Sequence, residues 1–459
     1  MTSQVATKAD YNLASPGLNT TKQFADFLAR FRFEDLPERA VHEARRGLID
    51  WLGCALAGSG HSTIDKLLVV LSAISGKPQA SVLGRKRKLG LMEAALANGQ
   101  MGHMLDYDDT HMGGVVLHTS GPVLAALLPL IELGGVGGRD LICAYAAGFE
   151  AGVRVGQSAP GHHAGGWHLT GTLGSIAAGA AAARLLRLDA PRMVHTLGIA
   201  ATQASGMQQN RGTMCKSFHA GKAAANGVLA ALLAERGFDS TQEIIEGEKG
   251  FCRIYSDVAE PERLTEDLGN GWVIESNGHK PYACGVVLHP LIDAVIAIRN
   301  RQPIDPAKVG EIGLRVHPLV LSITGVREPA TGLQSKFSTL HAAAVALIDG
   351  AAGVAQFADA KATDPAIVAL RRKVKPIADP SLRRDEACAS IVVGDQRHEA
   401  HIAHATGTAE NPMSDEQIES KFLANAAPVI GADRAKRAVE WVAALERQTD
   451  MRELIALVA

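Results

Sequence analysis

The amino-terminal half of the chain carries a helical pattern of apolar residues. From Thr20 to about Gly237, alanine and leucine recur at steps of three and four residues, with breaks at glycine or proline. This period predicts helices with a buried face. We expect them at roughly 21–31, 37–57, 62–75, 91–103, 121–133, 139–157, 170–186, 190–205, 218–236 and 240–246.

The pattern changes after Asn277. Short β-rich runs at 309–317, 387–393 and 397–403 are separated by two helical stretches near 286–301 and 337–350. Helical periodicity returns beyond Pro412, and this last segment is expected to dock back on the first domain. The predicted fold is therefore mainly α: a large all-helical domain, 1–277 completed by 406–459, plus a smaller inserted α+β lid domain, 278–405, with a mostly antiparallel sheet.

Composition narrows the possible functions. A length of 459 residues allows two domains with full cores, and a formal charge of −2 gives no basic face for nucleic acid or an anionic membrane. The polar amino terminus lacks a secretory signal, and the most apolar runs, 122–131 and 176–184, are too short to span a bilayer. The six cysteines include no Cys-x-x-Cys pair. We expect a cytoplasmic protein without nucleic-acid or membrane partners.

The segment from His103 to His118 has the highest concentration of ionisable side chains next to apolar runs. Three carboxylates and three imidazoles fall within this stretch, beside long apolar runs. Such a cluster is either an acid/base site or a metal site. In the first case carboxylates order the imidazoles, while Thr110 and Ser120 bind substrate oxygens. In the second, a metal-dependent hydrolase would use ligands drawn from Asp108, Asp109, His111 and His118.

Two later segments favour the acid/base interpretation. His163 and His168 lie in a glycine-rich stretch before a helix, where free N–H groups can bind an anion. Lys216 precedes a helix expected to begin near Phe218, a placement that suits an anion bound between them. Lys280 opens the second domain and can reach a cleft between domains. No nucleophile elbow or dinucleotide fingerprint is present. A non-catalytic helical binding protein remains an alternative.

Several blocks together resemble the MmgE/PrpD family, which includes 2-methylcitrate dehydratases, cis-aconitate decarboxylases and an iminodisuccinate epimerase. The resemblance extends over the whole chain and rests on the following blocks: Asp106-Tyr-Asp-Asp-Thr110, His118-Thr-Ser-Gly-Pro122, Gly166-Trp-His168, Lys216-Ser-Phe-His219-Ala-Gly221 with Asn226-Gly227, Leu347-Ile-Asp-Gly350, Gly407 to Pro412 and Lys421-Phe422. It implies a homodimer with a cofactor-free site between a helical domain and a lid.

The resemblance also implies which residues form the site. The pocket positions of cis-aconitate decarboxylases match Asp106, Thr110, His118, His168, Lys216 and Lys280. Two positions depart: His341 stands where decarboxylases and dehydratases carry a tyrosine, and His163 stands where the epimerase carries one.

The predicted function is that of a cofactor-free lyase, a dehydratase or decarboxylase. It would use acid/base chemistry at a carbon next to a carboxylate of a small di- or tricarboxylate. The alternative is an isomerase of a substituted succinate such as iminodisuccinate. The predicted catalytic residues are His118, His168, Asp106 and Lys216, without a metal. The predicted substrate-binding residues are Thr110, Lys280, His163, His341 and Ser120.

Overall fold

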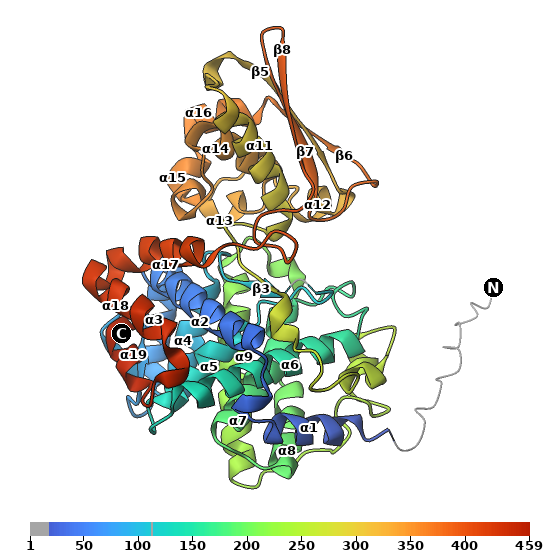
Figure 1. Ribbon diagram of the computed structural model, residues 1–459, viewed down its shortest axis with the longest axis vertical. Helices are drawn as coiled ribbons and strands as arrows, with labels where there is room; N and C mark the ends of the chain where they lie inside the picture. Colours follow the sequence, from blue (N-terminus) through green and yellow to red (C-terminus); the bar gives the residue numbers. More distant parts are fainter. Residues whose placement is uncertain (1–17, 112) are drawn as a thin grey trace, which may run out of the picture.

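A computed structural model describes residues 18–111 and 113–459, and its ribbon shows a large helical body below a smaller body with a sheet (Figure 1). The mainly α fold with a smaller α+β part is confirmed. The helical body contains α1 (Thr20–Arg30), α2 (Glu38–Ser59), α3 (Ser62–Ile74), α4 (Leu91–His103), α5 (Ser120–Ile131), α6 (Gly138–Ser158), α7 (Leu169–Leu185), α8 (Ala190–Ala201) and α9 (Met214–Glu235). The expected N-terminal segment without an export signal lies outside the described residues.

Two predictions from the sequence are wrong: the helix at 240–246 and the start of the helix that contains Phe218. The stretch 240–246 forms turns and no helix: Gly247 N donates to the carbonyl oxygen of Glu243, and Gly250 N donates to that of Gly247, which closes two tight turns. Helix α9 begins at Met214, four residues before the expected start, and the Thr213 hydroxyl caps it by accepting from Cys215 N. Lys216 therefore lies inside the first turn of α9 instead of preceding it.

Small residues bring the central helices close together. Helix α7 is buried along almost its whole length and packs against α9. At Gly227 of α9, an added Cβ would lie 2.5 Å from the backbone carbon of Ala178 in α7. This approach leaves no room for a larger side chain, which explains the glycine and alanine content of both helices.

The smaller body is a four-stranded sheet covered by helices, with a hydrophobic core of its own. The strand order is β6-β5-β7-β8. The strands β5 (Val309–Val316), β7 (Ala387–Val393) and β8 (Gln396–Ile402) were expected, and their pairing is antiparallel. Strand β6 (Val374–Ala378), which sequence reasoning missed, pairs parallel to β5. Helices α11 (His289–Arg301) and α14 (Thr339–Asp349) pack together under the sheet.

The last helices return to the helical body, as expected (Figure 1). They are α17 (Asp415–Ile430), α18 (Ala432–Ala443) and α19 (Arg452–Val458). Helix α17 packs against α2 and buries Phe422 completely in the helical core. The domain limits 277/278 and 405/406 stay predictions.

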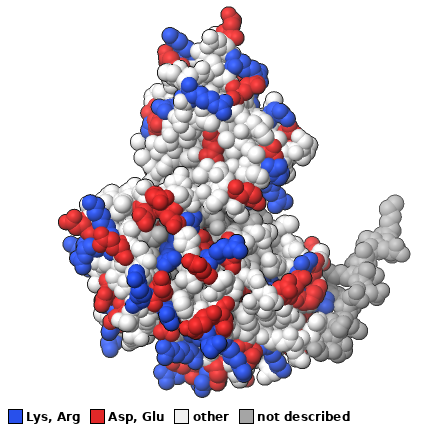
Figure 2. Space-filling model, in the orientation of Figure 1, with Lys and Arg blue, Asp and Glu red and all other residues white. Residues whose placement is uncertain are grey.

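The surface carries both signs of charge. Figure 2 shows Lys and Arg side chains interspersed with Asp and Glu on this face of both bodies. Among the described residues, no helix combines the length and apolarity needed to cross a membrane.

Candidate active site

A two-stranded ladder lies beside the polar cluster of residues 103–118. Strand β3 (Thr110–His111) pairs antiparallel with β4 (Asn277–Gly278). The segment between α4 and β3 carries Asp106, and the segment after β4 carries Lys280. Residues far apart in sequence therefore meet where the chain passes from the helical body into the smaller one.

Asp106 holds two lysines through one oxygen. Its Oδ1 lies 2.7 Å from Lys280 Nζ and 3.0 Å from Lys216 Nζ. Burial alone would raise the pKa of Asp106, but the two ammonium groups outweigh it and hold that pKa well below its usual range. Burial lowers the pKa of Lys216. Two cations facing one carboxylate leave an excess of positive charge that suits an anionic ligand.

The neighbouring Asp108 holds two imidazoles. His103 Nδ1 lies 2.8 Å, and His118 Nδ1 3.4 Å, from Asp108 Oδ2. Of the carboxylates expected to order the imidazoles, Asp108 contacts them, whereas the carboxylate of Asp106, a predicted catalytic residue, lies with the lysines. Asp108 is completely buried, and the two histidines hold its pKa well below the usual range against the effect of burial.

The hydrogen bonds of His118 define its tautomer. Its Nδ1 lies 3.0 Å from the carbonyl oxygen of Asp109 and 3.2 Å from Thr110 Oγ1. Because a carbonyl oxygen only accepts, Nδ1 carries a hydrogen, so the neutral form of this ring would have its lone pair on Nε2. The His118 side chain is 10% exposed, whereas those of His103 and Asp108 are completely buried.

His168 completes a group of stacked imidazoles. Its ring lies 5.6 Å from that of His103, and its Nδ1 lies 2.9 Å from His219 Nδ1. Burial, followed by the charge of Lys216, lowers the pKa of His168 well below its usual range. Burial likewise lowers the pKa of His103 to about 4. Both rings are therefore neutral near pH 7.

Ser120 faces Asp109 and not the lysines. At the first position of α5, its hydroxyl donates to Asp109 Oδ2 and shares a hydrogen bond with the hydroxyl of Tyr145. Asn277 Nδ2 donates to the same carboxyl oxygen at 2.6 Å. Burial raises the pKa of Asp109 to about 7. This arrangement ties the start of α5 to β4.

His163 and His341 lie outside the group formed by the Asp106 lysines and the Asp108 histidines. The half-buried His163 lies in a loop whose carbonyls at His163 and Trp167 accept from Gln208 Nε2. His341 Nε2 lies 2.9 Å from the carbonyl oxygen of Gln356, and burial lowers its pKa to about 4. Among the described residues, His341 makes no hydrogen bond or ion pair with the lysines or histidines of the cluster. Substrate contacts of both residues stay predictions.

The residues proposed for a metal alternative do not gather as expected. His111 Nδ1 lies 2.9 Å from the carbonyl oxygen of Val115, and the carboxylate of Asp109 accepts hydrogen bonds from Ser120 and Asn277. The group whose ligand atoms do meet, within 4.8 Å, is His103, Asp108 and His118. Two imidazoles and one carboxylate are a donor set that a divalent transition metal accepts. The contacts of Asp108 with His103 and His118 also account for the closeness of these atoms without a metal ion.

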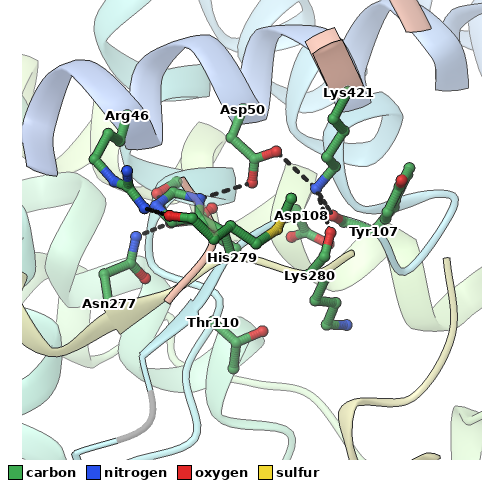
Figure 3. A network of polar contacts seen from close by, with 12 residues as sticks. Arg46, Asp50, Tyr107, Asp108, Thr110, Asn277, His279, Lys280 and Lys421 are labelled. Carbon is green, nitrogen blue, oxygen red and sulfur yellow. Dashed lines mark hydrogen bonds and ion pairs between the residues drawn. The ribbon is translucent and has the colours of Figure 1, made fainter. Parts of the chain in front are cut away.

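Sequence reasoning missed a second charged network behind the cluster (Figure 3). Asp50 of α2 lies 2.6 Å from Lys421 Nζ of α17 and 3.1 Å from His279 Nδ1. Glu43 lies 2.6 Å from the other ring nitrogen of His279. Against the effect of burial, these carboxylates raise the pKa of His279 to about 10. The sequence signal for this network was Asp50, a carboxylate within the apolar run of α2, because a buried charge requires a partner.

The family models match both parts of the chain. Residues 22–264 match the MmgE/PrpD N-terminal domain, and residues 282–447 match the MmgE/PrpD C-terminal domain. The chain belongs to the MmgE/PrpD family. The C-terminal family segment includes α17 and α18, which pack on the helical body, so the sequence division differs from the spatial one.

Named relatives within the MmgE/PrpD family are lyases. The chain is 28% identical to a cis-aconitate decarboxylase of Aspergillus terreus, over 98% of this chain and 97% of that protein. It is 26% identical to the cis-aconitate decarboxylase of Mus musculus, over 96% and 93% of the two chains. A 2-methylcitrate dehydratase of Cupriavidus necator is 24% identical over 77% of this chain and 76% of that protein.

Proposed function

We propose that this MmgE/PrpD protein is a lyase that acts on a small tricarboxylate, by decarboxylation or dehydration at a carbon next to a carboxylate. The observation that carries the proposal is the single carboxylate of Asp106 between the ammonium groups of Lys216 and Lys280, beside three imidazoles. Relatives aligned over nearly the whole chain are cis-aconitate decarboxylases, which makes decarboxylation the first reaction to assay.

Lys216 and Lys280 would bind substrate carboxylates. Each removed carboxylate or proton leaves an electron pair on carbon, and this pair delocalises into the adjacent carboxylate. Ammonium groups fixed in a buried site stabilise that developing charge more than water does. Such stabilisation lowers the barrier for both reactions.

His118 and His168 would transfer the protons. In dehydration, one imidazole takes the proton from carbon, the bond from the neighbouring carbon to its hydroxyl breaks, and that hydroxyl receives a proton from a second group and leaves as water. In decarboxylation, the carbon–carbon bond to the departing carboxylate breaks, carbon dioxide leaves, and the electron pair on carbon takes a proton. The negative charges of a bound tricarboxylate raise the proton affinity of the imidazoles, so that one of them can deliver this proton.

The assay is turnover of cis-aconitate and 2-methylcitrate in D₂O, followed by NMR and by carbon dioxide release. We expect the decarboxylation product of cis-aconitate to carry deuterium on carbon, and dehydration of 2-methylcitrate to appear as loss of its carbon-bound proton. We expect His118→Gln and His168→Gln each to lower kcat by about 10²–10⁴-fold. His401→Gln, at an exposed pair with Glu386, is the matched control. Full activity of both site variants would reject the assigned roles, and absence of turnover or exchange with either compound would reject the substrate class.

The remaining expectations stay predictions. A homodimer, a cytoplasmic location and independence of cofactors follow from the resemblance and from composition alone. No observation favours the isomerase alternative.

A further inference from the structure

Two buried lysines connect the segments that carry Asp106 and Lys280. Lys421 Nζ donates to the carbonyl oxygens of Tyr107, at 2.7 Å, and of Lys280, at 2.9 Å. Lys336 Nζ donates to the carbonyl oxygens of Leu105 and Ala283, both at 2.6 Å. Each lysine thus bridges one carbonyl of the first segment and one of the second.

The lysine bridges extend the β3–β4 pairing beyond the point where backbone hydrogen bonds end. In the β3–β4 pair, Thr110 lies opposite Gly278 and His111 opposite Asn277. Extended in the same antiparallel register, this pairing brings Leu105 opposite Ala283, which are the two residues joined by Lys336. Pro281 has no N–H to donate, and Asp106 has a positive φ of 52°, so regular strand pairing is interrupted between them.

The lysines come from elements outside the ladder. Lys421 extends from α17 of the helical body, and Lys336 follows α13 (Gly332–Ser335) in the smaller body. In Figure 3 the Lys421 ammonium lies between Asp50 and Tyr107, while the side chain of Lys280 points away from it. Lys336 and Lys421 both donate to backbone carbonyls, and Lys421 also pairs with Asp50. The ammonium groups of Lys216 and Lys280 instead face the carboxylate of Asp106.

We propose that Lys336 and Lys421 are positioning residues that hold Asp106 and Lys280 in register by bridging the carbonyl oxygens of their two segments. In the first segment the two bridges lie at Leu105 and Tyr107, on either side of Asp106, and in the second they lie at Lys280 and Ala283. The hydroxyl of Tyr107, which donates to Pro281 O at 3.1 Å, adds a third link. The consequence for catalysis rests on the proposed lyase function, whereas the consequence for backbone dynamics does not.

The test compares Lys336→Met with Lys373→Met. Lys373 also donates to a carbonyl oxygen, that of Val309 at 2.6 Å, but within the smaller body. Hydrogen–deuterium exchange of the full-length protein is followed in peptides covering 104–110 and 277–285. We expect exchange to accelerate about tenfold or more in both peptides of Lys336→Met and to stay unchanged in Lys373→Met. Unchanged exchange in a folded Lys336→Met protein would overturn the proposal.

Steady-state kinetics separate positioning from general stability. At equal thermal stability, we expect kcat of Lys336→Met to fall about tenfold or more below that of Lys373→Met, because a small displacement of Lys280 misplaces the substrate. Lys336→Arg, which can donate to both carbonyls, should recover much of this loss. Faster exchange with an undiminished kcat would overturn the positioning role.

Two controls keep the outcome decisive. If Lys336→Met does not fold, Tyr107→Phe removes one hydroxyl link only, and unchanged exchange in its 104–110 and 277–285 peptides would count against the proposal. If the wild-type protein turns over no carboxylate, the lyase function fails, while the exchange experiment still decides whether the bridges hold the two segments.

Discussion

Lys280 Nζ lies 2.7 Å from Asp106 Oδ1 although 174 residues separate them in the chain. Lys280 is 1% exposed and Asp106 4%, so the pair is shielded from solvent. Lys216 approaches the same oxygen from α9. A carboxylate placed between two ammonium groups offsets the cost of burying their charge, and two cations at one carboxylate suit a polyanionic ligand.

Asp106→Asn should lower kcat more than it changes KM. The amide cannot hold two ammonium groups through one anionic oxygen, so Lys216 and Lys280 lose their common anchor while their attraction for substrate carboxylates remains. We expect a fall of about 10²-fold in kcat, measured by steady-state kinetics on the tricarboxylate that the protein accepts. Asp140→Asn, at a surface ion pair with Arg187, should be unaffected. An undiminished kcat in Asp106→Asn would contradict the anchoring role.

Lys216→Met should instead weaken substrate binding. The variant removes one of the two cations that face the ligand and leaves a side chain of similar length. The loss of one charge-assisted hydrogen bond, about 1.5–3 kcal/mol, corresponds to a decrease in kcat/KM of roughly 10- to 100-fold. Lys222→Met, on the same helix, is the matched control because Lys222 makes no ion pair among the described residues. Equal kinetics of the two variants would argue against a carboxylate contact at Lys216.

The sequence predicted the main lines of this site but not its pairings. Helical period located α4, α7 and α9, and family motifs identified Asp106, His118, His168 and Lys216. Which carboxylate serves which partner depends on the left-handed backbone of Asp106 and on the turn that follows it, and no period or spacing encodes these. The roles of Lys336, Lys421 and Asp50 arise from long-range packing of three helical segments against two loops. Strand β6 was missed because its run Val-Lys-Pro-Ile-Ala contains a proline, which normally argues against a strand.

The buried imidazolium of His279 should make stability fall with rising pH. Its pKa is about 10 in the folded protein and about 6.5 in an unfolded chain. Its stabilising contribution is therefore complete below pH 6.5 and is lost progressively as the pH rises toward 10. In that window the slope from this one group approaches about 1.4 kcal/mol per pH unit.

Urea unfolding of wild type and His279→Gln between pH 6.5 and 10 measures this slope. We expect the difference in unfolding free energy between the two proteins to shrink as the pH rises. His401→Gln, at an exposed histidine, is the control for loss of an imidazole at the surface. A difference between wild type and His279→Gln that does not change with pH would mean that His279 is neutral in the folded protein.

Gly227→Ala should destabilise the helical body without touching the site. The added methyl group would meet the backbone of Ala178 in α7, and the helices have little room to separate because α7 is buried along almost its whole length and residues 223–228 of α9 are buried. Overpacking of this kind costs about 1–3 kcal/mol, even though alanine itself favours a helix. Gly134→Ala is the matched control because nothing lies within 4 Å of its added Cβ. Equal unfolding free energies for the two variants would show that α7 and α9 can separate, and close helix contact would then no longer explain their small residues.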